Sequence, residues 1–146
     1  MKKTLILYIY LPMVLLGQTF NGMTLFAPNQ GGGGGSFNSY LVNNEMDVIK
    51  SWSHSNGAAS MPYLLQDSTL VYPYRVPNPS MSSGGVGGGI SKYNWEGDLL
   101  FSYNNTDIVD SNKYFAIIES EDSLILGSNG GILLMSKSGT PLQKVE

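Results

Sequence analysis

His54 and Arg75 are the residues of this chain best suited to chemistry on an anionic group, because the sequence holds one histidine and one arginine. A histidine nucleophile or base needs one group that orients its ring and another that stabilises developing charge. No such partner is identifiable beside His54, which stands in the polar segment 52–57 after an apolar run. The pattern favours a solvent-facing loop histidine, and His54 is retained as the only catalytic candidate.

A cluster of anion-binding groups is predicted around Arg75. This residue directly precedes a Pro-Asn-Pro turn, and a glycine-rich run follows at 84–89. A guanidinium fork can bind a sulfate or carboxylate through two hydrogen bonds, and glycine N–H groups can form an anion-binding nest. Two alternatives stay open: the guanidinium could pair with Asp67, Glu96 or Asp98, and the glycine-rich run could be a lid or linker. The candidate binding residues are Arg75, Asn78, Gly87, Gly88 and Trp95, although a role in capping its turn is favoured for Asn78.

The sequence predicts neither a metal site nor a cofactor. There is no cysteine, which excludes disulfides and thiolate metal ligands. The pentaglycine run 31–35 is followed by neither a lysine nor a helical pattern, so a flexible loop is favoured over a phosphate-binding loop. The acidic residues lack the spacing of a calcium-binding loop and are expected to be exposed turn carboxylates, namely Asp107, Asp110, Glu121 and Asp122.

The N-terminus has the layout of a secretory signal peptide. Lys2 and Lys3 precede the apolar run 5–16, and a cleavage point follows at Gly17-Gln18. The run is shorter than the roughly 20 residues that a membrane-spanning helix needs, so a transmembrane protein is not expected. The prediction is a signal peptide over residues 1–17 and a secreted or bacterial periplasmic protein, with a buried N-terminal strand as the alternative.

Composition and charge fit a β-rich extracellular protein. Charged residues make up only 13% of the chain against 42% hydrophobic ones, and there are 18 glycines and 9 tyrosines to supply turns and strands. Without the two lysines of residues 1–17, the net charge is (8 − 2) − 11 = −5. This mildly acidic balance argues against nucleic acid or an anionic membrane as the partner.

Paired apolar segments around polar turns predict an all-β fold of five hairpins. No window shows a helical period between capped ends, and residues 24–28 add a short edge strand that ends at a proline. The turns of the expected hairpins lie at 43–47, 67–69, 95–98, 120–122 and 138–141.

The hairpins repeat, which predicts part of a β-propeller. Two alternating hairpin types every ~40–50 residues are typical of four-stranded propeller blades. After a leading segment and glycine-rich loop at 18–35, the predicted blades are 36–75 and 90–129, and a third begins at 130–146. A β-sandwich-like arrangement is the alternative. About two and a half blades cannot close a ring, so we expect part of a longer protein, or self-association through exposed sheet edges.

One succession of motifs is more specific than the hairpins. It runs from the Pro-Asn-Pro turn at 77–79 through the glycine-rich run to a Tyr-Asn-Trp-Glu-Gly-Asp segment at 93–98. Together with the strands before it, this part of the chain, about residues 20–105, resembles the N-terminal portion of secreted arylsulfotransferase-like β-propellers. The resemblance implies an enzyme that moves a sulfuryl group from a phenolic sulfate to a phenol, with a histidine nucleophile, further histidines and arginine around a central channel.

The chain departs from this family pattern where the chemistry would lie. Such proteins carry a paired histidine soon after the Trp-x-Gly-Asp hairpin, and residues 107–115 contain none. His54 alone cannot supply a histidine-based site, so this chain by itself is expected to be inactive as a sulfotransferase. The alternative function is a non-catalytic secreted binding or interaction module. A small phenolic or sulfated ligand is the expected partner, and Trp52, Trp95 and Tyr103 are expected to pack between blades.

Overall fold

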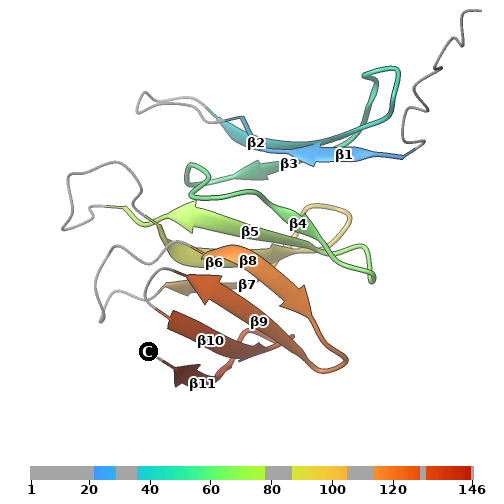
Figure 1. The fold of residues 1–146 in the computed structure, drawn as a ribbon. Coiled ribbons are helices and arrows are strands. Elements are labelled where there is room, and N and C mark those ends of the chain that lie inside the picture. Colours follow the sequence, from blue (N-terminus) through green and yellow to red (C-terminus); the bar gives the residue numbers. More distant parts are fainter. Residues whose placement is uncertain (1–21, 29–35, 78–86, 105–113, 129–130, 146) are drawn as a thin grey trace, which may run out of the picture.

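The computed structural model describes residues 22–28, 36–77, 87–104, 114–128 and 131–145. These residues form eleven strands and no helix, which confirms the all-β prediction. The strands build three antiparallel sheets that lie face to face, one above the next in chain order (Figure 1). The predicted signal peptide, the pentaglycine run, Asn78, Asp107 and Asp110 fall outside the described residues.

Each sheet is a meander in which consecutive strands are hydrogen-bonded neighbours. Sheet A contains β1 (Thr24–Phe26), β2 (Phe37–Val42) and β3 (Val48–His54). Sheet B contains β4 (Tyr63–Leu64), β5 (Leu70–Arg75), β6 (Gly88–Tyr93) and β7 (Leu99–Asn104). Sheet C contains β8 (Tyr114–Glu119), β9 (Ser123–Ser128), β10 (Gly131–Ser136) and β11 (Pro141–Val145). All five predicted hairpins are present, and β1 is an edge strand as expected.

The sheets divide the chain differently from the predicted blades 36–75 and 90–129. Strand β5 pairs with β6, for example Tyr72 with Ser91, so the second and third hairpins share one sheet. The sheet boundaries therefore fall between β3 and β4 and between β7 and β8. The residue pattern of a strand does not specify which strand pairs with it. A hairpin can therefore share a sheet either with the hairpin before it or with the hairpin after it. The long connection from β5 to β6, which the sequence suggested as a blade boundary, instead joins two strands of one sheet.

The same five-residue turn closes the last hairpin of every sheet. Its first residue donates its amide to the carbonyl of the fifth, and a side-chain oxygen of the first residue accepts the amide of the fifth. This holds for the turns that begin at Asn43, Asn94 and Ser136, and a bulge precedes each turn. The fourth residue has a left-handed backbone, with φ of 67° at Met46, 108° at Gly97 and 92° at Gly139. The predicted recurrence of one hairpin type, with turns at 43–47, 95–98 and 138–141, is therefore confirmed, although the predicted blade boundaries are not.

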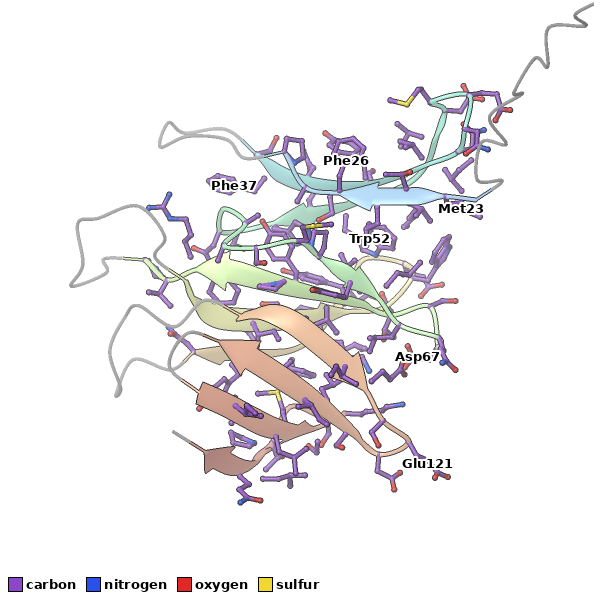
Figure 2. All side chains as sticks on the ribbon, viewed as in Figure 1. Met23, Phe26, Phe37, Trp52, Asp67 and Glu121 are labelled. Atoms are coloured by element: carbon purple, nitrogen blue, oxygen red, sulfur yellow. The ribbon has the colours of Figure 1, made fainter. Side chains whose placement is uncertain are left out.

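Two hydrophobic cores hold the stack together, one on each side of sheet B. Trp52 points from sheet A into the first core (Figure 2). Because sheet B is covered on both faces, β5 is a continuous apolar run without alternation, as expected for a strand buried on both sides. The core between sheets A and B contains Leu41, Trp52, Leu70, Tyr72, Tyr74, Val76 and Tyr93. The core between sheets B and C contains Leu65, Val71, Ile90, Leu124, Leu126, Leu133 and Met135.

Candidate functional site

His54 is buried between sheets A and B, so the prediction of a solvent-facing loop histidine is wrong. Strand β3 continues through this residue, and the two-residue period of a strand places His54 on the same inward face as Trp52. Its ring stacks on Tyr72, with ring centroids 3.5 Å apart, and meets the edge of Tyr93 at 4.9 Å. The polar neighbours of His54 in the sequence face away from this core and concealed its burial.

A hydrogen bond joins His54 to Ser39, a pairing that was not expected from the sequence. The Nε2 atom of His54 lies 2.8 Å from the Oγ of Ser39, which is the spacing of a base and its nucleophile. Ser39 is completely buried, however, and the Nδ1 of His54 is buried with no hydrogen-bond partner among the described residues. Burial lowers the pKa of His54 to about 4, so its ring is neutral at pH 7. Within the described part of the chain, the pair has no third group of the kind that orients a catalytic histidine.

A small polar cavity of about 70 Å³ lies beside His54. Several hydroxyls on its wall are hydrogen-bonded: Tyr74 Oη lies 3.0 Å from Ser102 Oγ, Ser91 donates to the same oxygen, and Tyr72 donates to the Asn56 carbonyl. Burial raises the pKa of Tyr72 and of Tyr93, so both phenols stay neutral. A cavity of this size accommodates about two water molecules, and its walls carry no charge to bind an anion.

Arg75, Gly87 and Gly88 are brought together at one end of sheet B. Arg75 is the register partner of Gly88, and the Val76 amide donates to the Gly87 carbonyl at 3.0 Å. The Arg75 side chain is exposed and forms no ion pair with any described carboxylate. Asp67, one of the expected partners, lies before the opposite end of β5 and pairs with Lys92 at 3.4 Å. The guanidinium is therefore open to solvent and to a ligand.

The buried glycines beside Arg75 have backbone and packing duties of their own. Gly88 has a φ of 98°, which favours glycine. At Gly89 a Cβ atom would lie 2.2 Å from the ring of Tyr74, so only glycine leaves room for that ring. Gly87 and Gly88 are also buried, and the fold of this strand end explains the glycines at 88 and 89.

Trp95 lies at the opposite end of β6 from Arg75, so the structure does not unite these two candidates. The rings of Trp52 and Trp95 meet edge to face at 5.6 Å, and Lys50 Nζ lies 5.9 Å from each. The indole N–H of Trp52 donates to the Asn94 carbonyl at 3.0 Å. The two tryptophans therefore pack between sheets as predicted, and Tyr103 packs against the core between sheets B and C.

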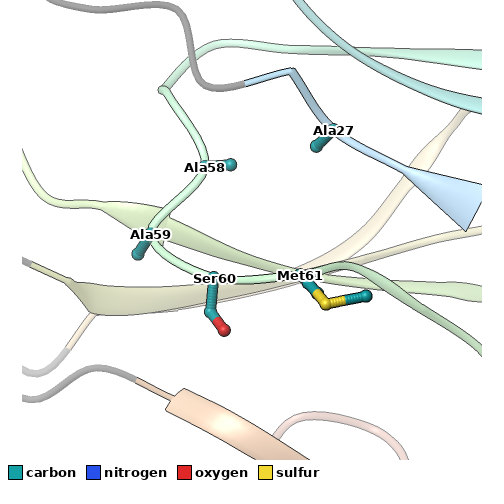
Figure 3. Close-up of a pocket in the computed structure, with 5 residues that line it drawn as sticks. All are labelled: Ala27, Ala58, Ala59, Ser60 and Met61. Atoms are coloured by element: carbon teal, nitrogen blue, oxygen red, sulfur yellow. The ribbon is translucent and has the colours of Figure 1, made fainter.

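One hollow of about 280 Å³ was not anticipated from the sequence (Figure 3). It lies between the end of β1 and the segment that leads to β4, and small side chains form most of its wall. The only sequence signal for it is the run of small residues at 58–60. The lining residues are Ala27, Ala58, Ala59, Ser60 and Met61, which offer van der Waals contact and one hydroxyl.

Within the described ranges, no three His, Cys, Asp or Glu side chains are grouped so that they could hold a metal ion. No helix there is long and apolar enough to cross a membrane. The chain matches no protein-family model, and no curated protein is significantly similar to it.

Proposed function

We propose that this chain is a secreted, non-catalytic module of arylsulfotransferase-like architecture, which binds aryl sulfates weakly at Arg75 and does not transfer their sulfuryl group. The single observation that carries the proposal is the burial of His54, the only histidine of the chain. A propeller arrangement of the three sheets and export through residues 1–17 belong to the same proposal.

The environment of His54 argues against sulfuryl transfer. A nucleophilic histidine must present a free ring nitrogen to the sulfur atom of the donor. In this chain the Nε2 atom of His54 is hydrogen-bonded to Ser39, and Tyr72 covers one face of the histidine ring. The Nδ1 atom of His54 is buried in the core. No second histidine or arginine exists in the chain to stabilise charge on the transferred group.

The surroundings of Arg75 favour binding of an anion. The guanidinium is exposed at a strand end, and no described carboxylate competes for it. A guanidinium binds sulfate oxygens in bidentate geometry more specifically than an ammonium does. A phenolic sulfate supplies the matching oxygens, and its aromatic ring can lie along apolar surface.

The test is a titration with 4-nitrophenyl sulfate, followed by calorimetry and by release of 4-nitrophenol in the presence of phenol. We expect binding without release. Loss of a hydrogen bond to a charged group costs about 1.5–3 kcal/mol, so Arg75→Gln should weaken binding by roughly ten-fold to a hundred-fold.

Lys50→Gln is the matched control, since it removes a cation at the opposite end of the sheets and should leave the affinity unchanged. Equal affinity in the wild type and in Arg75→Gln would refute the binding site. Release of 4-nitrophenol that His54→Gln abolishes would refute the non-catalytic assignment.

A further inference from the structure

Each sheet in the stack has a forward face, toward the following sheet, and a backward face, toward the preceding sheet. The forward face of sheet A is covered by sheet B, and the forward face of sheet B is covered by sheet C. Among the described residues, nothing covers the forward face of sheet C or the backward face of sheet A (Figure 1).

The repeated five-residue turns identify equivalent positions in the three sheets. Four residues before the turn, sheet A has Ser39, sheet B has Ile90 and sheet C has Ile132. Ser39 and Ile90 are each 0% exposed, whereas Ile132 is 50% exposed. The side chain at this forward-facing position is therefore buried under the following sheet in sheets A and B, whereas in sheet C it is exposed.

The forward face of sheet C is apolar across three strands. Ile118, Ile125 and Leu134 form one row of register partners, and Ile132 lies beside that row on β10. Because Leu133 and Met135 fill the opposite face, β10 is apolar on both faces, a pattern of sheets covered on both sides. No charged side chain belongs to this row or to its neighbours Ser136 and Gln143. The face is suited to another sheet and not to an open, solvated surface.

The backward face of sheet A offers a matching surface. Phe26 and Tyr40 are register partners whose rings lie 5.7 Å apart at its centre, and both are partly exposed. Figure 2 shows Phe26 on the side of sheet A that points away from sheet B. Its β3 neighbours on this face, Ser51 and Ser53, are uncharged as well, so no charge opposes contact with sheet C.

A second repeated contact connects the outermost strand of each sheet to the closing turn of the next. Lys50 of β3 donates to the Glu96 carbonyl in the turn of sheet B at 3.4 Å. At the equivalent place one sheet on, Phe101 of β7 lies against Gly139, whose Cβ position would be 2.9 Å from that of Phe101. The next members of this series are Gln143 of β11 and Met46 in the turn of sheet A, and both are exposed.

We propose that a second copy of this chain stacks head to tail on the first, with the forward face of sheet C on the backward face of sheet A of the other copy. This contact between the two copies repeats the packing of sheet A on sheet B and of sheet B on sheet C. Two such contacts close a ring of six sheets, within the four to eight that β-propellers contain. Each contact joins two different surfaces, but the two contacts are equivalent by twofold symmetry, so the dimer interface as a whole is isologous. It does not depend on ligand binding at Arg75.

Disulfide trapping tests the geometry, since the wild-type chain contains no cysteine. Met46→Cys and Gln143→Cys are prepared as separate variants, mixed and oxidised. The equivalence with Phe101 and Gly139 predicts that a covalent dimer forms in the mixture and not in either variant alone. Met61→Cys, at an exposed position outside both faces, is the matched control and should not cross-link to Gln143→Cys.

Light scattering after gel filtration tests the assembly itself. We expect a dimer for the wild type, a monomer for Ile132→Lys, and a dimer for Leu99→Lys, which places the same charge at an exposed leucine of sheet B. Both substituted positions are at least half exposed, so far-ultraviolet circular dichroism should show unchanged folding. A wild-type monomer, an oligomer other than a dimer, a dimer that survives Ile132→Lys, or cross-linking of Gln143→Cys with itself would overturn the proposal.

Discussion

The two interfaces of sheet B are built on the same backbone repeat but use different chemistry. Toward sheet A, sheet B presents the rings of Tyr72 and Tyr93, which contact the ring of His54, and the Asn94 carbonyl, which accepts a hydrogen bond from Trp52. Toward sheet C, it presents Val71 and Ile90 to four aliphatic or thioether side chains that are almost completely buried. The polar interface depends on the protonation state of its groups, whereas the aliphatic interface depends mainly on the area it removes from water.

This difference shows what the repeat constrains and what it leaves free. The five-residue turns and their bulges fix strand register, and therefore which side chains face each neighbour. The identity of those side chains is not fixed: Ser39 and Ile90 occupy the same position, one with a hydrogen bond to histidine and one with aliphatic contacts. A repeated backbone can thus carry one interface with a buried, titratable histidine and one with an aliphatic core.

The largest effect is expected from a cavity in the aliphatic interface. Leu126 is 0% exposed, and Leu126→Ala should lower the free energy of unfolding by about 2–5 kcal/mol, since it removes buried methyl groups and leaves a void. Urea unfolding followed by tryptophan fluorescence measures the change. Leu142→Ala, at an exposed position of the same sheet, should stay within about 0.5 kcal/mol of the wild type. Equal losses in the two variants would show that sheet C is not packed as described.

A smaller effect, confined to the polar interface, is expected from acid. The pKa of His54 is lowered by burial from 6.5 to about 4, so the folded state favours the neutral ring more than the unfolded state does. This stabilisation is complete above pH 6.5 and is lost as the pH falls toward 4. The difference in pKa corresponds to about 3 kcal/mol at most.

The measurement is the free energy of unfolding between about pH 5.5 and 8, above the range in which most ordinary carboxylates titrate. His54→Gln should remove the slope between pH 6.5 and about 5.5, because no other histidine exists in the chain. A slope that persists in this variant would mean that His54 is not the group responsible.

The smallest of the three effects is expected from loss of one hydrogen bond across β2 and β3. Ser39→Ala leaves Nε2 of His54 without its partner in the core and should cost about 1–3 kcal/mol at pH 7. Ser53→Ala in the same sheet removes an exposed hydroxyl that donates to Asn38, and its cost should be near zero. A larger loss in Ser53→Ala than in Ser39→Ala would contradict the assigned burial.

Local sequence signals predicted the strands well, and long-range contacts decided the parts that were predicted wrongly. The turn residues Asn43, Asn94 and Gly97 indicate hairpins. The two asparagine side chains accept hydrogen bonds within the turn, and glycine adopts the left-handed backbone that the turn requires. The burial of His54 and the grouping of hairpins into sheets could not be read in this way. Both features depend on residues about 20 positions away in the sequence. Tyr72 covers His54, and Ser91 pairs with Tyr72 where β5 meets β6.

By itself the sequence determined the all-β class, the five hairpins, the repeated turn and the lack of cysteine chemistry, since these follow from composition and from contacts between near neighbours. Only the tertiary structure decided that Arg75 is exposed and that Lys92 forms an ion pair with Asp67. It also decided that His54 forms a hydrogen bond with Ser39 and stacks on Tyr72. Among the described residues, it also leaves one apolar face of sheet C uncovered. The physical reason is that burial and pairing are set by which faces meet, and a strand's sequence specifies its two faces but not its neighbours.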